Sequence, residues 1–145
     1  MELKVKKMRD NAILPTRGSE EAAGVDLYAC IDKPITINPG ECVNFPSGIG
    51  CEFPEGYYGQ IVVRSSIGFK RHLGLVNQVG IIDNDYKNEI LIGLYNFGDS
   101  PQIIEPNERV VQMILLPYIK AEIKMTEMLS ESERGLGGIG STGKF

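Results

Sequence analysis

The sequence predicts an all-β protein, a distorted jelly roll or β-barrel with one short helix and a flexible, glycine-rich C-terminal tail. Short runs of β-branched and apolar residues recur along the chain, and turn-forming residues such as Asn38-Pro39-Gly40 and Pro54-Glu55-Gly56 separate them. Many short apolar runs separated by turn residues are typical of sandwiches, barrels and jelly rolls. No long segment repeats its apolar residues with the period of an α-helix.

The individual elements follow from this pattern of apolar runs and turn residues. The helix is predicted at Ser66–His72, because Ser65 or Ser66 can cap its first turn. Ala121–Ser132 can also be drawn as a helix, but a strand followed by a linker is preferred. The predicted strands are Val25–Ala29, Ile35–Ile37, Glu41–Phe45, Ile49–Phe53, Tyr57–Arg64, Leu73–Ile82, Glu89–Phe97, Gln102–Glu105, Glu108–Tyr118 and Ala121–Leu129.

The C-terminal residues differ in composition from the strands before them. Residues 134–143 are rich in glycine and follow the polar stretch Ser130–Glu133. Because such a segment cannot form a packed element alone, we divide the chain into a β domain at 1–129 and a flexible arm at 130–145 that becomes ordered over another surface. Arg134 opens the glycine-rich part and the hydroxyls of Ser141 and Thr142 close it, a combination that suits an anion cradle.

Composition and charge exclude several classes of protein. The 145 residues suit one domain, and the net charge of −4 argues against a nucleic-acid surface of clustered Lys and Arg. The single histidine, His72, excludes His-rich metal sites. No apolar stretch reaches the roughly 20 residues of a membrane span, and the charged N-terminus lacks the apolar core of a signal peptide. We expect a cytoplasmic protein, or a nuclear one in a eukaryote or virus, with no membrane or nucleic-acid partner.

Polar residues that interrupt the apolar runs outline a candidate site. Asp26 lies inside an apolar strand, where its carboxylate is either satisfied by neighbouring donors or serves a cation. Asp83 and Tyr86 lie in a turn between two apolar strands. No cysteine or histidine nucleophile accompanies them, so the set favours metal-assisted hydrolysis of a polyphosphate. The donors suited to phosphate are Arg64, Ser65, Ser66, Gln112, Arg134, Ser141 and Thr142.

Five of these segments together have the order of a known set of motifs. They read AAGVDLYA at 22–29, RSS at 64–66, GIIDNDY at 80–86, ERVVQM at 108–113 and RGLGGIGSTG at 134–143. Each is weak alone, but in this order they resemble the motifs of the trimeric dUTPase family. The resemblance implies a jelly roll assembled as a homotrimer, in which each active site lies between subunits and the arm of a third subunit closes it.

The resemblance also implies roles for individual residues. Asp83 matches the catalytic aspartate that holds the attacking water, Tyr86 the aromatic that packs on the deoxyribose, and Asp26 the acid that reaches Mg2+ through water. The positions that contact the uracil are Asn77, Gly80, Ile81 and Ile82. Those that contact the phosphates are Arg64, Ser65, Ser66 and Gln112. The arm positions that cover the γ-phosphate and the base are Arg134, Ile139, Gly140, Ser141 and Thr142.

The implied reaction is hydrolysis of dUTP to dUMP and pyrophosphate with Mg2+, which limits uracil in DNA and supplies dUMP. Two alternatives stay open: a dCTP deaminase-like enzyme, which does not need the glycine-rich arm, and a regulatory protein of this fold that binds a protein partner. Ile139 stands where the family usually has an aromatic residue that stacks on the base. We expect a looser lid, since stacking contributes roughly 1–3 kcal/mol per base.

Overall fold

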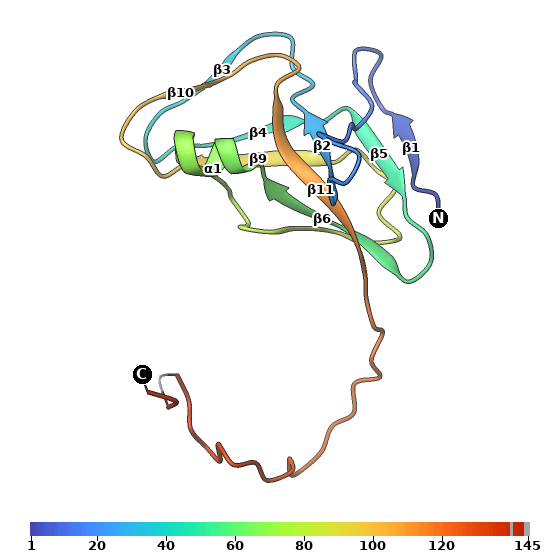
Figure 1. The fold of residues 1–145 in the computed structure, drawn as a ribbon, viewed down its shortest axis with the longest axis vertical. Coiled ribbons are helices and arrows are strands. Elements are labelled where there is room, and N and C mark those ends of the chain that lie inside the picture. Colours follow the sequence, from blue (N-terminus) through green and yellow to red (C-terminus); the bar gives the residue numbers. More distant parts are fainter. Residues whose placement is uncertain (140, 144–145) are drawn as a thin grey trace.

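The computed structural model describes residues 1–139 and 141–143, and it confirms the all-β prediction (Figure 1). A short helix, α1 (Ser65–Arg71), lies between β6 and β7. The strands are β1 (Lys4–Lys7), β2 (Gly24–Tyr28), β3 (Ile35–Ile37), β4 (Cys42–Pro46), β5 (Ile49–Glu52), β6 (Tyr57–Val63), β7 (Leu73–Leu75), β8 (Gly80–Ile82), β9 (Leu91–Asn96), β10 (Gln102–Ile104) and β11 (Arg109–Pro117).

The strands pair in antiparallel sheets. The larger sheet has the order β2-β11-β6-β8, a second has the order β4-β9-β7, and β1 pairs with β5 as β3 does with β10. β11 is central to the larger sheet because it pairs with β2 on one side and with β6 on the other. Within residues 1–139 and 141–143 the strands do not close on themselves, which agrees with a jelly roll rather than a closed barrel.

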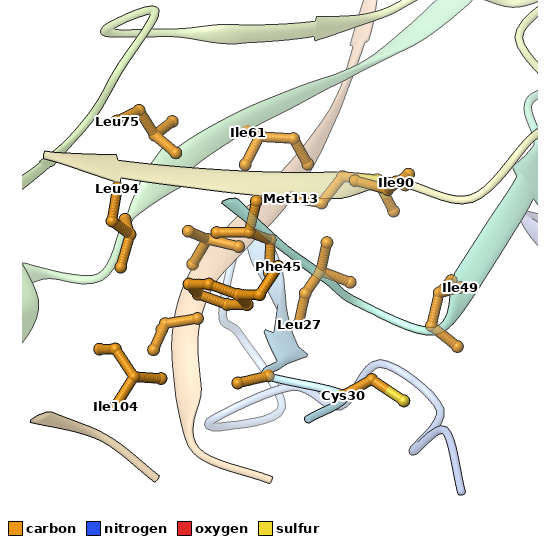
Figure 2. Close-up of a cluster of buried hydrophobic side chains, with 14 of the residues drawn as sticks. Leu27, Cys30, Phe45, Ile49, Ile61, Leu75, Ile90, Leu94, Ile104 and Met113 are labelled. Carbon is orange, nitrogen blue, oxygen red and sulfur yellow. The ribbon is translucent and has the colours of Figure 1, made fainter. Parts of the chain in front are cut away.

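The hydrophobic core lies between the two larger sheets (Figure 2). The buried side chains include Phe45 and Leu94 from the sheet β4-β9-β7. They also include Leu27, Ile61 and Met113 from the sheet β2-β11-β6-β8. Each such side chain stabilises the fold by roughly 1.5–3 kcal/mol relative to leaving it in water. This packing fixes β2, β6 and β11, so the residues at their ends are held on a rigid support.

Three element boundaries differ from the sequence prediction. The N-terminal segment, where no strand was predicted, forms β1 and pairs with β5. The predicted strand Leu73–Ile82 is two strands, β7 and β8, because the backbone N–H of Val79 bonds to the Asn77 carbonyl oxygen and closes a turn between them. The helix begins at Ser65, and its N-cap is Arg64 in an extended conformation rather than a serine.

The predicted strand at Ala121–Leu129 is wrong within this chain. Residues 119–139 form neither strand nor helix and are exposed, and Figure 1 shows this segment running away from the sheets. The apolar side chains of Ile123 and Met125 stand 97% and 98% exposed. The composition suits a strand, but a strand needs a neighbour for its backbone N–H and C=O groups, and this segment has none beside it.

The three cysteines are free thiols that differ in burial. Cys30 and Cys51 are buried thiols, and burial raises the pKa of Cys51 to about 11, so it packs as a neutral group, whereas Cys42 is exposed. In the part of the chain that the structure describes, no helix has both the length and the apolar composition that crossing a membrane requires.

Candidate active site

One group of candidate residues meets where β2, β11 and β6 lie side by side. In the antiparallel register, Gln112 of β11 lies opposite Asp26 of β2. β6 runs along the other side of β11, and Arg64 follows its last residue. The Arg64 guanidinium donates to the backbone carbonyl of Arg109 at 3.1 Å, which holds it against β11.

Asp26 is a buried carboxylate held by two arginines. Its side chain belongs to a residue only 7% exposed; Oδ1 lies 3.2 Å from Nε of Arg64, and Oδ2 lies 3.2 Å from Nη1 of Arg109. The sequence left open whether neighbouring donors satisfy this carboxylate, and the structure shows that they do. Arg109 was not predicted as a site residue, although its charge in an apolar strand was an available signal. Each guanidinium keeps further N–H donors for an anion.

The guanidinium donors suit a polyphosphate, and the Asp26 carboxylate suits a magnesium ion that is bound together with it. Among the described residues, no group of three or more His, Cys, Asp or Glu side chains could hold a metal ion by itself. Mg2+ is usually bound through one or two carboxylates plus substrate phosphates, and it keeps several waters. The water-mediated role of Asp26 fits this pattern and stays a prediction.

The candidate base-binding residues lie in the segment from β7 to β8, which we call the hairpin although its strands pair with different neighbours, β7 with β9 and β8 with β6. The backbone N–H of Val79 donates to the Asn77 carbonyl oxygen at 2.6 Å, with Gln78 between them at φ 61°. A Cβ on Gly80 would stand 2.9 Å from Cβ of Ile61, so the close approach of β8 to β6 requires glycine. The hairpin borders a hollow of about 290 Å³, and its lining includes Asn44, Asn77, Gly80, Ile81, Ile82 and Gly93.

Asp83 and Tyr86 lie at the two ends of the turn after β8. The backbone N–H of Tyr86 donates to the Asp83 carbonyl oxygen at 3.1 Å, which closes a four-residue turn. Both side chains line a hollow of about 190 Å³, which shares Ile81, Ile82 and Leu91 with the hollow at the hairpin. Because Asp83 is exposed, a water molecule can reach its carboxylate without a change in fold.

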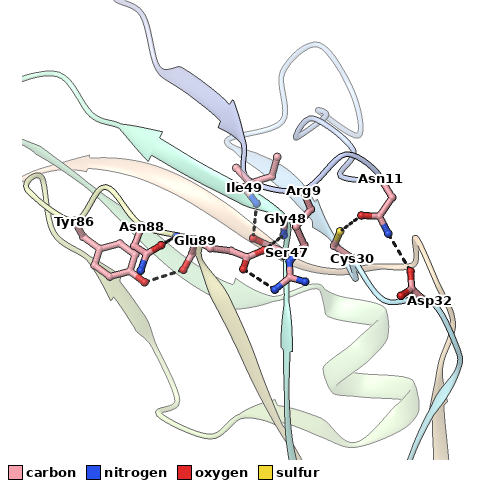
Figure 3. Close-up of polar contacts among 10 residues, drawn as sticks. All are labelled: Arg9, Asn11, Cys30, Asp32, Ser47, Gly48, Ile49, Tyr86, Asn88 and Glu89. Carbon is pink, nitrogen blue, oxygen red and sulfur yellow. Dashed lines mark hydrogen bonds and ion pairs between the residues drawn. The ribbon is translucent and has the colours of Figure 1, made fainter.

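An ion pair fixes the far end of the segment that carries Asp83 and Tyr86 (Figure 3). Arg9 donates through Nε and Nη2 to the two carboxylate oxygens of Glu89, at 2.6 and 3.0 Å. The backbone N–H of Gly48 also donates to Glu89, at 3.0 Å, and the Tyr86 hydroxyl donates to the Glu89 carbonyl oxygen at 2.7 Å. Sequence reasoning missed this pair, because its members are 80 residues apart and resemble ordinary surface charges.

The Arg9–Glu89 pair makes stability depend on pH. The pKa of Glu89 is lowered from its ordinary value of 4.5, chiefly because the Arg9 side chain donates hydrogen bonds to the carboxylate. A lowered folded-state pKa gives stability that is present above the unfolded value and is lost as the pH falls through the folded value. We expect Glu89→Gln to lower the Tm at pH 7, and the difference from wild type to shrink below about pH 4.

Thermal melts between pH 3 and pH 7 measure this dependence. Glu55→Gln, which removes an exposed carboxylate from the turn between β5 and β6, is the control and should leave the profile unchanged. A Tm difference between Glu89→Gln and wild type that is constant across this range would contradict the assignment.

Asp83 and the arginine cluster are separated along β6. β8 pairs with the middle of β6, where Ile82, the residue before Asp83, lies opposite Gly59, and Arg64 follows the last residue of the strand. At about 3.4 Å per residue, Gly59 and Arg64 are roughly 17 Å apart along the strand. The Arg64 guanidinium pairs with Asp26 of β2, across β11, and so it does not extend toward the side of β6 on which β8 lies.

The arm residues are separate from both groups. Arg134, Ile139, Ser141 and Thr142 are exposed, and Gly140 lies outside the described residues. The predicted site residues therefore form two groups within one chain, and the arm residues at 130–139 and 141–143 are exposed and hydrogen-bond to neither group. The first group is Asp26, Arg64, Ser65, Ser66 and Gln112, and the second is Asn77, Gly80, Ile81, Ile82, Asp83 and Tyr86.

A jelly-roll-like chain with a guanidinium cluster and an exposed carboxylate beside a small hollow has the features of a nucleotide hydrolase. The family model described as dUTPase matches residues 10–143. A protein named deoxyuridine 5′-triphosphate nucleotidohydrolase from Hydrogenobaculum sp. (strain Y04AAS1) is 43% identical and covers 99% of each chain. One of the same name from Paraburkholderia xenovorans (strain LB400) is 38% identical and covers 99% of this chain and 98% of its own. The chain belongs to the dUTPase family of enzymes.

Solved structures agree with this assignment. The dUTPase of Staphylococcus bacteriophage 80alpha with dUpNHpp superposes with a TM-score of 0.89 at 27% identity, over 99% of both chains. A mutant dUTPase from phage phi11 of S. aureus, whose structure concerns a structural Mg(II) ion, has a TM-score of 0.81 at 21% identity and supports the fold alone. The predicted jelly-roll-like fold is thus confirmed.

Proposed function

We propose that this protein hydrolyses dUTP to dUMP and pyrophosphate by attack of an Asp83-held water on the α-phosphorus. The observation that carries the proposal is the position of Asp83. Its exposed carboxylate directly follows the hairpin that borders the small hollow, and it shares a second hollow with Tyr86. Relatives with high identity over the whole chain are named for this reaction.

The reaction forms one P–O bond and breaks another. The water oxygen bonds to the α-phosphorus, the bond from that phosphorus to the oxygen bridging to the β-phosphate breaks, and pyrophosphate leaves with the electron pair. Asp83 accepts a hydrogen bond from the water and takes up its proton, which then passes to solvent. Aspartate is ionised at neutral pH, and holding a nucleophile in attack position contributes several kcal/mol to the rate.

The phosphates are bound by the cluster at the β2–β11–β6 junction. Arg64, the hydroxyls of Ser65 and Ser66, and the Gln112 amide donate to phosphate oxygens and reduce the negative charge that repels the nucleophile. Asp26, through water, and the phosphates would hold Mg2+, which would supply further charge neutralisation.

The hairpin and Tyr86 select the nucleoside. Backbone groups from Gly80 to Ile82 and the Asn77 side chain hydrogen-bond the uracil edge, and cytosine would leave these groups unpaired at a large cost in binding. The Tyr86 ring, held by its hydroxyl bond to Glu89, packs on the deoxyribose and leaves no room for a 2′-hydroxyl.

Each active site combines the hairpin of one subunit with the phosphate-binding residues of a second subunit, in a closed homotrimer. The separation of the two groups along β6 supports this arrangement. The arm at 130–145 of a third subunit covers the site: Arg134, Ser141 and Thr142 cover the γ-phosphate, while Ile139 and Gly140 cover the base. A cytoplasmic location stays a prediction.

Pyrophosphate release from dUTP, dCTP, dTTP and UTP with Mg2+ tests the proposal. We expect kcat/KM for dUTP to exceed that for dCTP by about 10⁴-fold, because unpaired polar groups in a base pocket are costly. Equal turnover of all four nucleotides contradicts it, and ammonia release from dCTP would identify a deaminase instead.

A further inference from the structure

Asn84, the neighbour of Asp83, ties the turn after β8 to a second turn. Its Nδ2 lies 2.7 Å from the carbonyl oxygen of Pro54 and 3.1 Å from those of Phe53 and Tyr57. A carboxamide NH2 has two hydrogens, so one of them is shared between two carbonyls. Three converging carbonyl oxygens accept a donor and repel an acceptor, so this place suits an amide and excludes a carboxylate.

The turn that receives Asn84 joins β5 to β6 and is itself held at several points. The backbone N–H of Tyr57 donates to the Pro54 carbonyl oxygen at 3.1 Å around Gly56, which has φ 79°. The Gly56 carbonyl accepts from the backbone N–H of Tyr118 at 2.9 Å, and Phe53 is buried in the core. Asn84 therefore bonds to a part of the fold that is fixed on both sides.

We propose that Asn84 is a positioning residue that fixes the direction in which the Asp83 carboxylate points; this role rests on the proposed function. Asn84 is the second residue of the four-residue turn from Asp83 to Tyr86, so its side-chain bonds set the orientation of the turn relative to β6. The family resemblance assigns roles to Asp83 and Tyr86 but none to position 84.

Asn84→Ala is expected to lower kcat for dUTP about 10- to 100-fold, because a displacement of about 1 Å in a reacting group costs this much. KM and the affinity for the non-hydrolysable analogue dUpNHpp should stay within about two-fold of wild type, since the Asn84 amide donates to carbonyl oxygens of the turn between β5 and β6. Asn84→Ser, which keeps one donor, should be intermediate.

The matched control is Asn88→Ala in the same loop. Among residues 1–139 and 141–143, the Asn88 side chain accepts one local bond, from the backbone N–H of Glu89 at 2.8 Å, so its loss should change kcat by less than about two-fold. Thermal melts give the Tm of every variant, and kcat is then measured below the Tm of each. A loss of kcat under these conditions is a positioning effect and not unfolding.

A double-mutant cycle decides whether Asn84 acts through Asp83. In an Asp83→Asn background, Asn84→Ala should leave the residual turnover unchanged. The same fold loss in both backgrounds, or a parallel loss of dUpNHpp affinity, overturns the positioning role. If Asp83→Asn itself leaves kcat unchanged, the proposed function fails; if Asp83→Asn lowers kcat and Asn84→Ala does not, the positioning role alone fails.

Discussion

Asp83→Asn should lower kcat for dUTP by about 10²–10⁴-fold, the range that a general base contributes. Asparagine keeps the size of the side chain and can still contact the water, but its amide cannot take up a proton. KM should change little, because the hairpin and the phosphate cluster are untouched. Steady-state pyrophosphate release measures both constants, and a melt should show an unchanged Tm, since Asp83 is exposed.

The turn itself provides a control for this prediction. Asp85 lies in the same turn, is also exposed and carries the same charge. Asp85→Asn should therefore reproduce any general effect of removing a negative charge near the phosphates without removing the base. Equal losses of kcat in the two variants would mean that Asp83 has no special role.

The second large effect is expected at the start of α1. Ser66→Glu places a carboxylate where the proposal puts the phosphates, and repulsion between charges about 4 Å apart is roughly 4 kcal/mol at an effective dielectric constant near 20. We expect kcat/KM for dUTP to fall by at least about 100-fold. Ser66 is exposed, so the Tm should stay close to that of wild type.

Combining the two variants tests whether subunits share active sites. Asp83→Asn and Ser66→Glu should each be nearly inactive alone. Co-expressed in equal amounts, they assemble at random, and about a quarter of the sites receive an intact Asp83 from one chain and an intact Ser66 from another, so about a quarter of wild-type activity should return. No recovery in purified mixed trimers would show that one chain supplies both groups.

The sequence predicted most of the fold because local pattern determines strands and turns. The run at Leu73–Ile82 shows the limit: its composition is that of one strand, and only the bond between Val79 and Asn77 interrupts it. Ala121–Leu129 shows another limit, since apolar alternation indicates a strand but does not say whether a partner strand lies beside it.

The candidate site was predicted less completely than the fold. Asp83 and Asp26 stood out because carboxylates are unusual beside apolar strands. Arg109 and Glu89 did not stand out. The register of β11 against β2 brings Arg109 to Asp26, and the fold brings Glu89 to Arg9, which lies 80 residues away along the chain. The charge of Arg109 in an apolar strand was a local signal, but which carboxylate each arginine pairs with depends on tertiary structure.

Hydrolysis of dUTP in H2¹⁸O tests the central claim most directly, because the position of the label reports which phosphorus the water attacks. Mass spectrometry of the products after a single turnover should find one ¹⁸O atom in dUMP and none in pyrophosphate. Label in pyrophosphate instead would place the attack on the β-phosphorus and contradict the proposed role of Asp83.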